Sequence, residues 1–329
     1  MRAFLFFYLC PSFHQIENTL ETTSTPTPGR TQSELGLILG AFAVTYLVWG
    51  STYLANWWAV RSIPPFLLAG ARFTFAGLLM YVIGLAIGQA KVTRKHWRNA
   101  IFAGFLLFVV GNGALVWALQ YIDSGIVALM VAFEPLMVVG FQWKMRGLRP
   151  GWKTLAGILL GIFGMALLVG QPDFVSDPHW VTALVAIFIG MIGWAYVSVW
   201  LTEAELPNST FQSASLQMLA GGPILLVIAV FHGDFQAFHF AEVTAKAWWS
   251  LGYLTLGGSI LAFTAFNFLL KKVATEKVVT NTYVNPVVAL FLGWSLNSEH
   301  ISNQSLMASV LLLGGVVLIN SRLIRRRRK

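Results

Sequence analysis

Two stretches of this sequence align on each other: residues 131–143 read VAFEPLMVVGFQW, and residues 282–294 read TYVNPVVALFLGW. The alignment places Pro135 on Pro286, a spacing of 151 residues (286 − 135). Earlier in the chain a spacing of 145 residues (194 − 49) places Trp49 on Trp194. The chain therefore carries one sequence pattern twice. The two spacings also align Phe66 with Phe211, Arg72 with Gln217, Gly77 with Gly222, Leu119 with Leu270, Trp143 with Trp294 and Gly164 with Gly315.

The composition excludes a soluble globular protein, because 57% of the residues are hydrophobic and only 11% are charged. Apolar runs of about 18–25 residues can cross a bilayer as helices. Each copy holds five, an odd number, so the second copy is expected to be inverted, as in many secondary transporters. We expect an all-α integral membrane protein with ten transmembrane helices in two inverted five-helix repeats. The expected spans are Leu35–Trp57, Phe66–Gly88, Ala100–Tyr121, Gly125–Phe141, Thr154–Gly170, Trp180–Leu201, Phe211–Phe231, Trp248–Leu270, Val278–Leu296 and Leu306–Leu323.

The domain organisation follows from these spans. Residues 1–34 are expected to be a polar, disordered extension, residues 35–170 the first repeat, residues 171–324 the second repeat, and residues 325–329 a basic tail. The Gly157-x-x-x-Gly161 pattern allows close helix packing within the monomer or in a dimer, so the oligomeric state stays open.

The net charge of +9 is distributed unevenly. If the N-terminus is cytoplasmic, nearly all basic loops lie inside, as the positive-inside rule requires. The loop from Thr202 to Thr210 differs, since it carries Glu203 and Glu205. We expect a bacterial inner-membrane protein with both termini in the cytoplasm, a tail that contacts membrane lipids, and no nucleic-acid partner. The inner basic residues are Lys91, Arg94, Lys95, Arg98, Lys144, Arg146, Arg149, Lys153, Lys271, Lys272, Lys277, Arg322, Arg325, Arg326, Arg327, Arg328 and Lys329.

No pattern indicates a metal, a cofactor or an enzyme. Cys10 is the only cysteine, and the six histidines are scattered without ligand spacing. The sequence has no Walker-type phosphate loop and no nucleophile–base pair or metal set within the spans.

Polar residues inside the spans are expected to face the interior of the bundle, because they are costly in lipid. Thr45, Trp49, Thr52 and Asn56 share one face of the first span. This stripe fits either a water-accessible cavity or hydrogen bonds between helices. Further candidates for solute binding are Asn112, Asn267, Asn281 and Asn285.

Two charged residues, Arg72 and Glu134, lie deep within the spans. Arg72 is about 10 Å into the second span at a rise of 1.5 Å per residue. Either it binds an anionic group of a solute, or it is a structural lock to carbonyls or to Glu134. Glu134 precedes Pro135 near the middle of its span and falls on Asn285 before Pro286. Interrupted helices at matching positions indicate a midplane binding site, so Glu134 is a candidate for proton coupling or only for pairing with Arg72.

Trp49 and Trp194 lie deep within their spans and either stack on an aromatic or amphipathic solute or pack the core.

Eight short motifs along the chain resemble those of the EamA-type drug/metabolite transporter superfamily. The second half is most similar to the YedA-like bacterial exporters of that superfamily. One departure is Gln142-Trp-Lys-Met-Arg146, where that family often has a Gly-Glu pair, while Ser298-Glu299 keeps the acid after the ninth span. The resemblance implies ten helices and export of small metabolites or amphipathic compounds. The matching motifs are Trp49-Gly-Ser-Thr-Tyr53, Ile63-Pro-Pro65, Ala71-Arg-Phe73, Ala118-Leu-Gln-Tyr121, Ser124-Gly125, Glu134-Pro-Leu136, Tyr283-Val-Asn-Pro-Val-Val-Ala289 and Leu292-Gly-Trp294.

The leading hypothesis is a secondary active transporter that exports small metabolites, amino acids or amphipathic drugs by alternating access, with protons as a candidate coupling ion. The alternatives are a membrane-embedded enzyme and a non-transporting membrane scaffold. The sequence does not identify the solute.

Overall fold

The structure, a computed structural model, describes residues 32–169, 179–273 and 275–325. Most of the expected N-terminal extension and of the basic tail lies outside these residues. The chain divides into two units, Met1–Leu39 and Gly40–Lys329. The described part of the first unit is the opening of helix α2, and all other described elements belong to the second.

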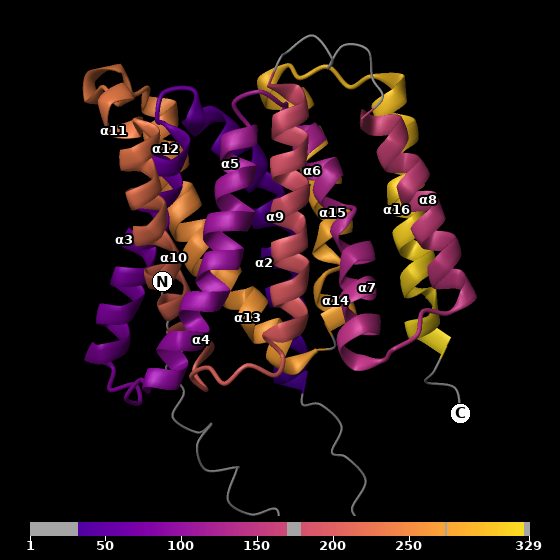
Figure 1. The fold of residues 1–329 in the computed structure, drawn as a ribbon, viewed down its shortest axis with the longest axis horizontal. Coiled ribbons are helices and arrows are strands. Elements are labelled where there is room, and N and C mark those ends of the chain that lie inside the picture. The colour runs from indigo at the N-terminus through magenta and orange to yellow at the C-terminus, as the bar shows by residue number, and fades with distance from the viewer. Residues whose placement is uncertain (1–31, 170–178, 274, 326–329) are drawn as a thin grey trace, which may run out of the picture. The chain divides into compact units, whose positions relative to one another are not determined.

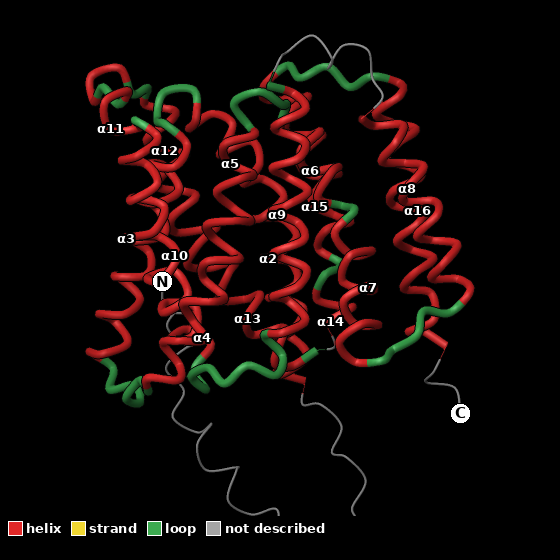
Figure 2. The backbone as a smooth tube through the Cα atoms, viewed as in Figure 1, coloured by secondary structure: helices red, strands yellow, loops and turns green. Residues whose placement is uncertain are grey.

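Every regular element of the described residues is helical, as Figures 1 and 2 show. The first half comprises α2 (Gln32–Val60), α3 (Pro65–Ala86), α4 (Arg94–Gly104), η2 (Phe105–Gly113), α5 (Ala114–Ala118), α6 (Ser124–Val131), α7 (Glu134–Arg146) and α8 (Trp152–Val169). The second half comprises α9 (Trp180–Trp200), α10 (Thr210–His232), α11 (Asp234–Ala237), η4 (Phe240–Glu242), α12 (Ala245–Tyr253), η5 (Leu254–Ala262), α13 (Phe263–Lys272), α14 (Thr275–Val278), α15 (Asn281–Asn297) and α16 (Asn303–Arg325).

Seven helices among the described residues are long and apolar enough to cross a membrane. They cover the first four and the sixth to eighth of the expected spans. Two more apolar helices, Trp152–Leu168 and Val284–Asn297, are shorter, and the tenth expected span lies in α16. The all-helical membrane fold is therefore confirmed, while the number of ten spans and their inverted arrangement stay predictions.

Two of the spans contain a π-helical segment, where the helix is wound more widely than an α-helix. Segment η2 lies within the span Arg94–Ala118, and η5 lies within Ala245–Lys272. Hydrophobic periodicity does not reveal such segments, because one π-turn adds a single residue to the repeat. Each π-helical segment therefore changes the side of the helix on which the residues after it lie.

The two prolines interrupt their spans differently. Helix α6 ends at Val131, and Pro135 lies in the first turn of α7, where a missing backbone N–H costs nothing. Pro286 lies inside α15, and the break in this span comes earlier, between α14 and α15. The expected matching interruptions are thus offset, because α15 keeps its helical course through Pro286.

Small residues bring two helix pairs close together. A Cβ atom on Gly77 of α3 would lie 2.8 Å from the backbone nitrogen of Leu219 in α10. Helices α8 and α16 run side by side in Figure 1, and a Cβ atom on Gly315 would lie 2.6 Å from the carbonyl oxygen of Gly157. The Gly157-x-x-x-Gly161 pattern is therefore used for packing within the monomer.

The loops between α3 and α4, α7 and α8, and α9 and α10 all lie at one end of the bundle, the lower end in Figure 1. The two acids of the α9–α10 loop form ion pairs there, Glu203 with Arg146 at 3.1 Å and Glu205 with Lys95. These acids therefore neutralise part of the positive charge of the basic residues at the same end. The side of the membrane on which this end lies stays a prediction.

Candidate functional site

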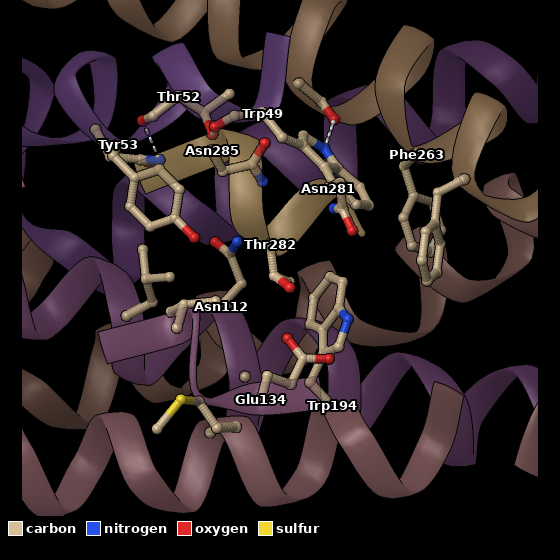
Figure 3. Close-up of a pocket in the computed structure, with 18 of the residues that line it drawn as sticks. Trp49, Thr52, Tyr53, Asn112, Glu134, Trp194, Phe263, Asn281, Thr282 and Asn285 are labelled. Carbon is tan, nitrogen blue, oxygen red and sulfur yellow. Dashed lines mark hydrogen bonds between the residues drawn. The ribbon is translucent and has the colours of Figure 1, made fainter. Parts of the chain in front are cut away.

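A cavity of about 100 Å³ lies among the helices (Figure 3). Its walls come from α2, α3, η2, α5, α6, α7, α9, η5, α13 and α15, and we refer to it as the central cavity. Nine residues that the sequence singled out line it, namely Trp49, Thr52, Asn56, Arg72, Asn112, Glu134, Trp194, Asn281 and Asn285. The fold therefore brings residues from both sequence copies to one place.

Arg72 is buried, with 4% of its surface exposed, and it is bonded to neutral oxygens. Its Nε donates to the hydroxyl of Ser259 at 2.7 Å, and its Nη1 donates to the amide oxygen of Asn56 at 3.3 Å. The Ser259 hydroxyl in turn donates to the carbonyl of Leu254 within η5 at 3.2 Å. The π-segment thus orients an acceptor toward Arg72.

Glu134 is equally buried, with 4% of its surface exposed, and its Oε1 has no hydrogen-bond partner among the described residues. Arg72 and Glu134 do not form an ion pair with each other or with any other described residue. The sequence-based alternative of an Arg72–Glu134 lock is therefore wrong. The cavity holds one cationic and one acidic side chain, neither of which has a counter-ion from the described part of the chain.

Asn112 adds a second free acceptor to the cavity. Its Oδ1 is buried without a hydrogen-bond partner in the described residues. Figure 3 shows Asn112 between Tyr53 and Thr282, with Glu134 below it. Buried polar atoms are nearly always hydrogen-bonded, so free acceptors that line a cavity indicate a place for a donor from a ligand or water.

Aromatic rings form another wall of the central cavity. Trp49 and Trp194 meet edge to face, with ring centroids 6.0 Å apart at 80°. Phe266 packs against both rings, at 5.1 Å from Trp49 and 6.2 Å from Trp194. The indole nitrogen of Trp49 donates to the carbonyl of Gly258 in η5 at 3.1 Å. The two matched tryptophans therefore contact each other as well as the cavity.

The polar stripe of the first span reaches the cavity only in part. Thr52 and Asn56 line it, and the Asn56 amide donates to the carbonyl of Thr52 at 2.8 Å. Thr45 is not among the lining residues, and its hydroxyl donates to the carbonyl of Phe42 at 3.0 Å. In α15, the Asn285 side chain donates to the carbonyls of Asn281 and Tyr46, both at 3.0 Å, when its amide nitrogen and oxygen are assigned from these partners.

Asn267 does not line the central cavity. Its amide oxygen accepts from Gln217 at 3.3 Å, and its amide nitrogen donates to the carbonyl of Phe263 at 2.9 Å. Pro135 and Pro286 are also absent from the lining. Gln217, the matched position of Arg72, thus takes part in a neutral side-chain network.

Sequence reasoning missed Tyr53 and Ser259. Tyr53 lines the cavity and is buried, and its position one helical turn after Trp49 was a signal that could have indicated this. Ser259 holds Arg72 from a helix 187 residues away in sequence, and no pattern in the chain indicates that contact. Among the described residues, no group of three or more His, Cys, Asp or Glu side chains could hold a metal ion.

Apolar helices around a buried cavity with uncompensated charges are typical of membrane transporters. The sequence model of the EamA-like transporter family matches residues 35–170 and 181–321. The uncharacterized inner membrane transporter YedA of Escherichia coli (strain K12) is 33% identical over 86% of this chain and 90% of the relative. The chain belongs to the EamA-like transporter family.

Two further comparisons agree with this assignment. A probable terminal-alkyne amino-acid exporter of Streptantibioticus cattleyicolor is 26% identical over 90% of this chain and 97% of the relative. A solved crystal structure with 22% sequence identity superimposes with a TM-score of 0.65 over 90% of this chain and 99% of that chain, which shows the shared fold.

Proposed function

We propose that the protein is a secondary active transporter whose central cavity binds a small zwitterionic solute of the amino-acid type. The observation that carries the proposal is the pair of uncompensated side chains, Arg72 and Glu134, in one cavity. Burying an unpaired charge costs several kcal/mol, about 3 at the centre of a membrane helix. A solute with both an anionic and a cationic group offsets both costs when it binds.

The side of the cavity formed by Arg72 and the side formed by Glu134 and Asn112 differ in the hydrogen bonds that they can make. A guanidinium group has donors only, so Arg72 suits a carboxylate. The free oxygens of Glu134 and Asn112 are acceptors, so they suit an ammonium group. The tryptophan wall suits an apolar or aromatic side chain of the solute. A related chain is named as a probable amino-acid exporter, which supports the same class of solute.

Transport then requires that the cavity open to each side in turn. We propose that the two sequence copies rock against each other, that the solute leaves the cytoplasm, and that a proton on Glu134 exchanges with the solute. The buried position of Glu134 in the cavity supports the coupling step, because its carboxylate can hold either a proton or the ammonium group of the solute.

The test is a thermal-shift screen of purified protein against amino acids, sugars, aromatic compounds and cationic drugs, followed by transport in proteoliposomes with an imposed pH gradient. Amino acids are expected to raise the melting temperature, and Glu134→Gln is expected to abolish gradient-driven transport. Binding of sugars alone, or unchanged gradient-driven transport by Glu134→Gln, would contradict the proposal.

Asn112 and Asn267 provide a matched pair for this screen. Asn112→Ala removes a free acceptor from the cavity and is expected to weaken solute binding about tenfold, the value of one hydrogen bond to a charged group. Asn267→Ala removes an amide that is bonded outside the cavity, so it is expected to lower stability and leave the affinity unchanged. Equal loss of affinity in both variants would show that the cavity is not the binding site.

A further inference from the structure

Four residues of the described chain have a left-handed backbone conformation, and they form two matched pairs. Gly88 and Gly233, with φ of 72° and 87°, follow α3 and α10 at a spacing of 145 residues (233 − 88). Gly147 and Ser298, with φ of 66° and 53°, end α7 and α15 at a spacing of 151 residues (298 − 147). These are the two spacings that align the sequence copies, so the same backbone turn recurs in both.

The residue after each turn differs between the copies. In the first copy the turn is followed by Gln89 or Leu148, and in the second copy by Asp234 or Glu299. Both acids are buried, and both cap the N-terminus of a helix from the first copy. Asp234 accepts from the backbone nitrogens of Phe66 and Leu67 in α3, at 2.8 and 2.9 Å. The charge distribution predicts that these acids lie at the outer end of the bundle.

Glu299 binds α6 through both carboxylate oxygens. Its Oε1 accepts from the hydroxyl of Ser124 at 2.7 Å, and its Oε2 accepts from the backbone nitrogen of Gly125 at 3.2 Å. Asp123 stands at the N-cap position of α6 but makes no capping hydrogen bond. Glu299, 175 residues away from Ser124 in sequence, therefore accepts the hydrogen bonds that the first turn of α6 offers.

The same carboxylate is joined to a third helix. Asn297 donates to Glu299 Oε1 at 3.1 Å and accepts from the indole nitrogen of Trp58 at 2.9 Å. Trp58 lies near the end of α2, so one chain of hydrogen bonds ties α2, α15 and α6 together. All three helices carry residues that line the central cavity.

The position of Glu299 places this connection over the cavity. Along α6, Gly125 precedes the lining residue Val131 by about 9 Å at 1.5 Å per residue. Along α15, Gly293 follows the lining residue Asn285 by about 12 Å. The carboxylate lies against Gly293 and 3.5 Å from where a Cβ atom of Gly125 would be. Helices α6 and α15 therefore pack closely around the Glu299 carboxylate, about two helical turns away from the residues that line the cavity.

At the N-terminal end of α15, the contact between α2 and the N-cap residue of α15 is neutral. The hydroxyl groups of Tyr46 and Thr280 lie 2.7 Å apart, and no carboxylate of the described residues takes part in that contact. The connection at the Glu299 end is thus charge-assisted, and the connection at the other end is not. Charge-assisted hydrogen bonds are roughly twice as strong as neutral ones.

We propose that Glu299 is the latch of an outer gate: it holds the outer ends of α2, α6 and α15 together, and this connection must break when the cavity opens outward. The inference rests on the proposed transport function, and it assigns the gate to a residue that does not line the cavity. It also predicts that the resting carrier favours the outward-closed state.

The test measures access to the cavity from outside and needs no solute. Cys10→Ser removes the only cysteine, and Leu115→Cys places a thiol on the cavity wall. In right-side-out vesicles, a membrane-impermeant maleimide is expected to label this thiol slowly. Glu299→Gln removes the charge from the latch and is expected to raise the labelling rate about tenfold or more, because hydrogen bonds to charged groups are lost.

Asp234→Asn is the matched control, because it alters the equivalent acid at the end of α10. Helices α3 and α10 are packed along their length through Gly70, Gly77 and Gly222, so loss of this cap should lower the melting temperature without speeding labelling. Ser124→Ala is a milder variant that removes one bond to Glu299 and should raise the rate by a smaller factor.

The outcomes distinguish an effect on the gate from a general loosening of the fold and from a failure of the proposed transport function. Unchanged labelling in folded Glu299→Gln, or in Ser124→Ala if the first variant does not fold, would overturn the proposal. An equal increase in Asp234→Asn would also overturn it, since general loosening would then explain the result. If no solute is transported but Glu299→Gln labels faster, the latch stands and the proposed transport function fails.

Discussion

Two buried acids of this protein are expected to respond to substitution with opposite signs. Glu134 has 4% of its surface exposed and Asp234 has 2%. Glu134 Oε1 has no partner among the described residues, whereas Asp234 accepts two backbone N–H groups and pairs with His232 at 2.6 Å. Both acids are buried, so the difference lies in their hydrogen-bond and ion-pair partners.

The magnitudes follow from that difference. A buried polar group without a hydrogen bond costs about 1–3 kcal/mol in proteins, and Glu134→Met of similar size removes this cost. Asp234→Asn weakens charge-assisted bonds at a helix N-terminus and should cost about 1–3 kcal/mol. Helix α3 begins with Pro64 and Pro65, and Pro64 offers no side-chain cap of its own. Each kcal/mol corresponds to roughly 2–4 °C in Tm.

The assay is thermal unfolding of purified protein in one detergent, followed by intrinsic fluorescence, together with transport in proteoliposomes. Glu134→Met should melt several degrees above the wild type and fail to transport, while Asp234→Asn should melt several degrees below it. The reasoning is refuted if Glu134→Met melts below the wild type and still transports, because Glu134 would then be a structural residue. A higher Tm for Asp234→Asn would refute the capping argument.

Three further predictions concern packing, pH and the π-segment. Gly104→Ala places a methyl group against the backbone of Gln217 and Gly221 and should cost about 1–3 kcal/mol in unfolding experiments, whereas Gly140→Ala meets nothing within 4 Å and should be neutral or slightly stabilising. The pKa of Asp123 is raised by burial and by the charge of Glu299, so the contribution of Asp123 to wild-type stability should fall as pH rises above about 4. This decline should be absent when Tm of D123N is measured against pH. W49F removes the bond to a carbonyl in η5 and should lower unfolding stability by about 1 kcal/mol.

The sign of the pH prediction follows from proton binding. A raised pKa means that the folded protein holds the Asp123 proton at pH values where the unfolded chain has released it. The contribution of Asp123 to stability is therefore greatest below the unfolded value of about 3.9 and declines as pH rises through the folded pKa. If the wild type and the D123N variant show the same pH profile, the assigned environment of Asp123 is wrong.

Strong local signals in the sequence were sufficient to predict part of the lining of the cavity. Intramembrane charges and a repeated tryptophan are informative by themselves, because lipid penalises the first and matched spacing identifies the second. Arg72, Glu134, Trp49 and Trp194 all line the central cavity. Their roles in binding and coupling stay predictions.

The partners of these residues could not be predicted. Periodicity tells which residues share a helix face but not which neighbouring helix that face meets. Asn267 turned toward Gln217 of α10, while Phe263 and Phe266 of the same helix reached the cavity. Segment η5 precedes them, and its wider turn sets their orientation in a way that a 3.6-residue period does not describe.

The Ser298 conformation connects the repeated architecture to the proposed gate. Three of the four left-handed turns use glycine, which adopts positive φ without strain, and the fourth uses serine. A non-glycine residue in this region costs about 1–2 kcal/mol, and such strain persists only where the surroundings enforce it. Here the turn aims Glu299 at the start of α6, so the carboxylate bonds at Ser124 and Gly125 offset the strain. Outward opening would break those bonds and leave the strain uncompensated, and the turn would then favour release of the latch once it has begun to open.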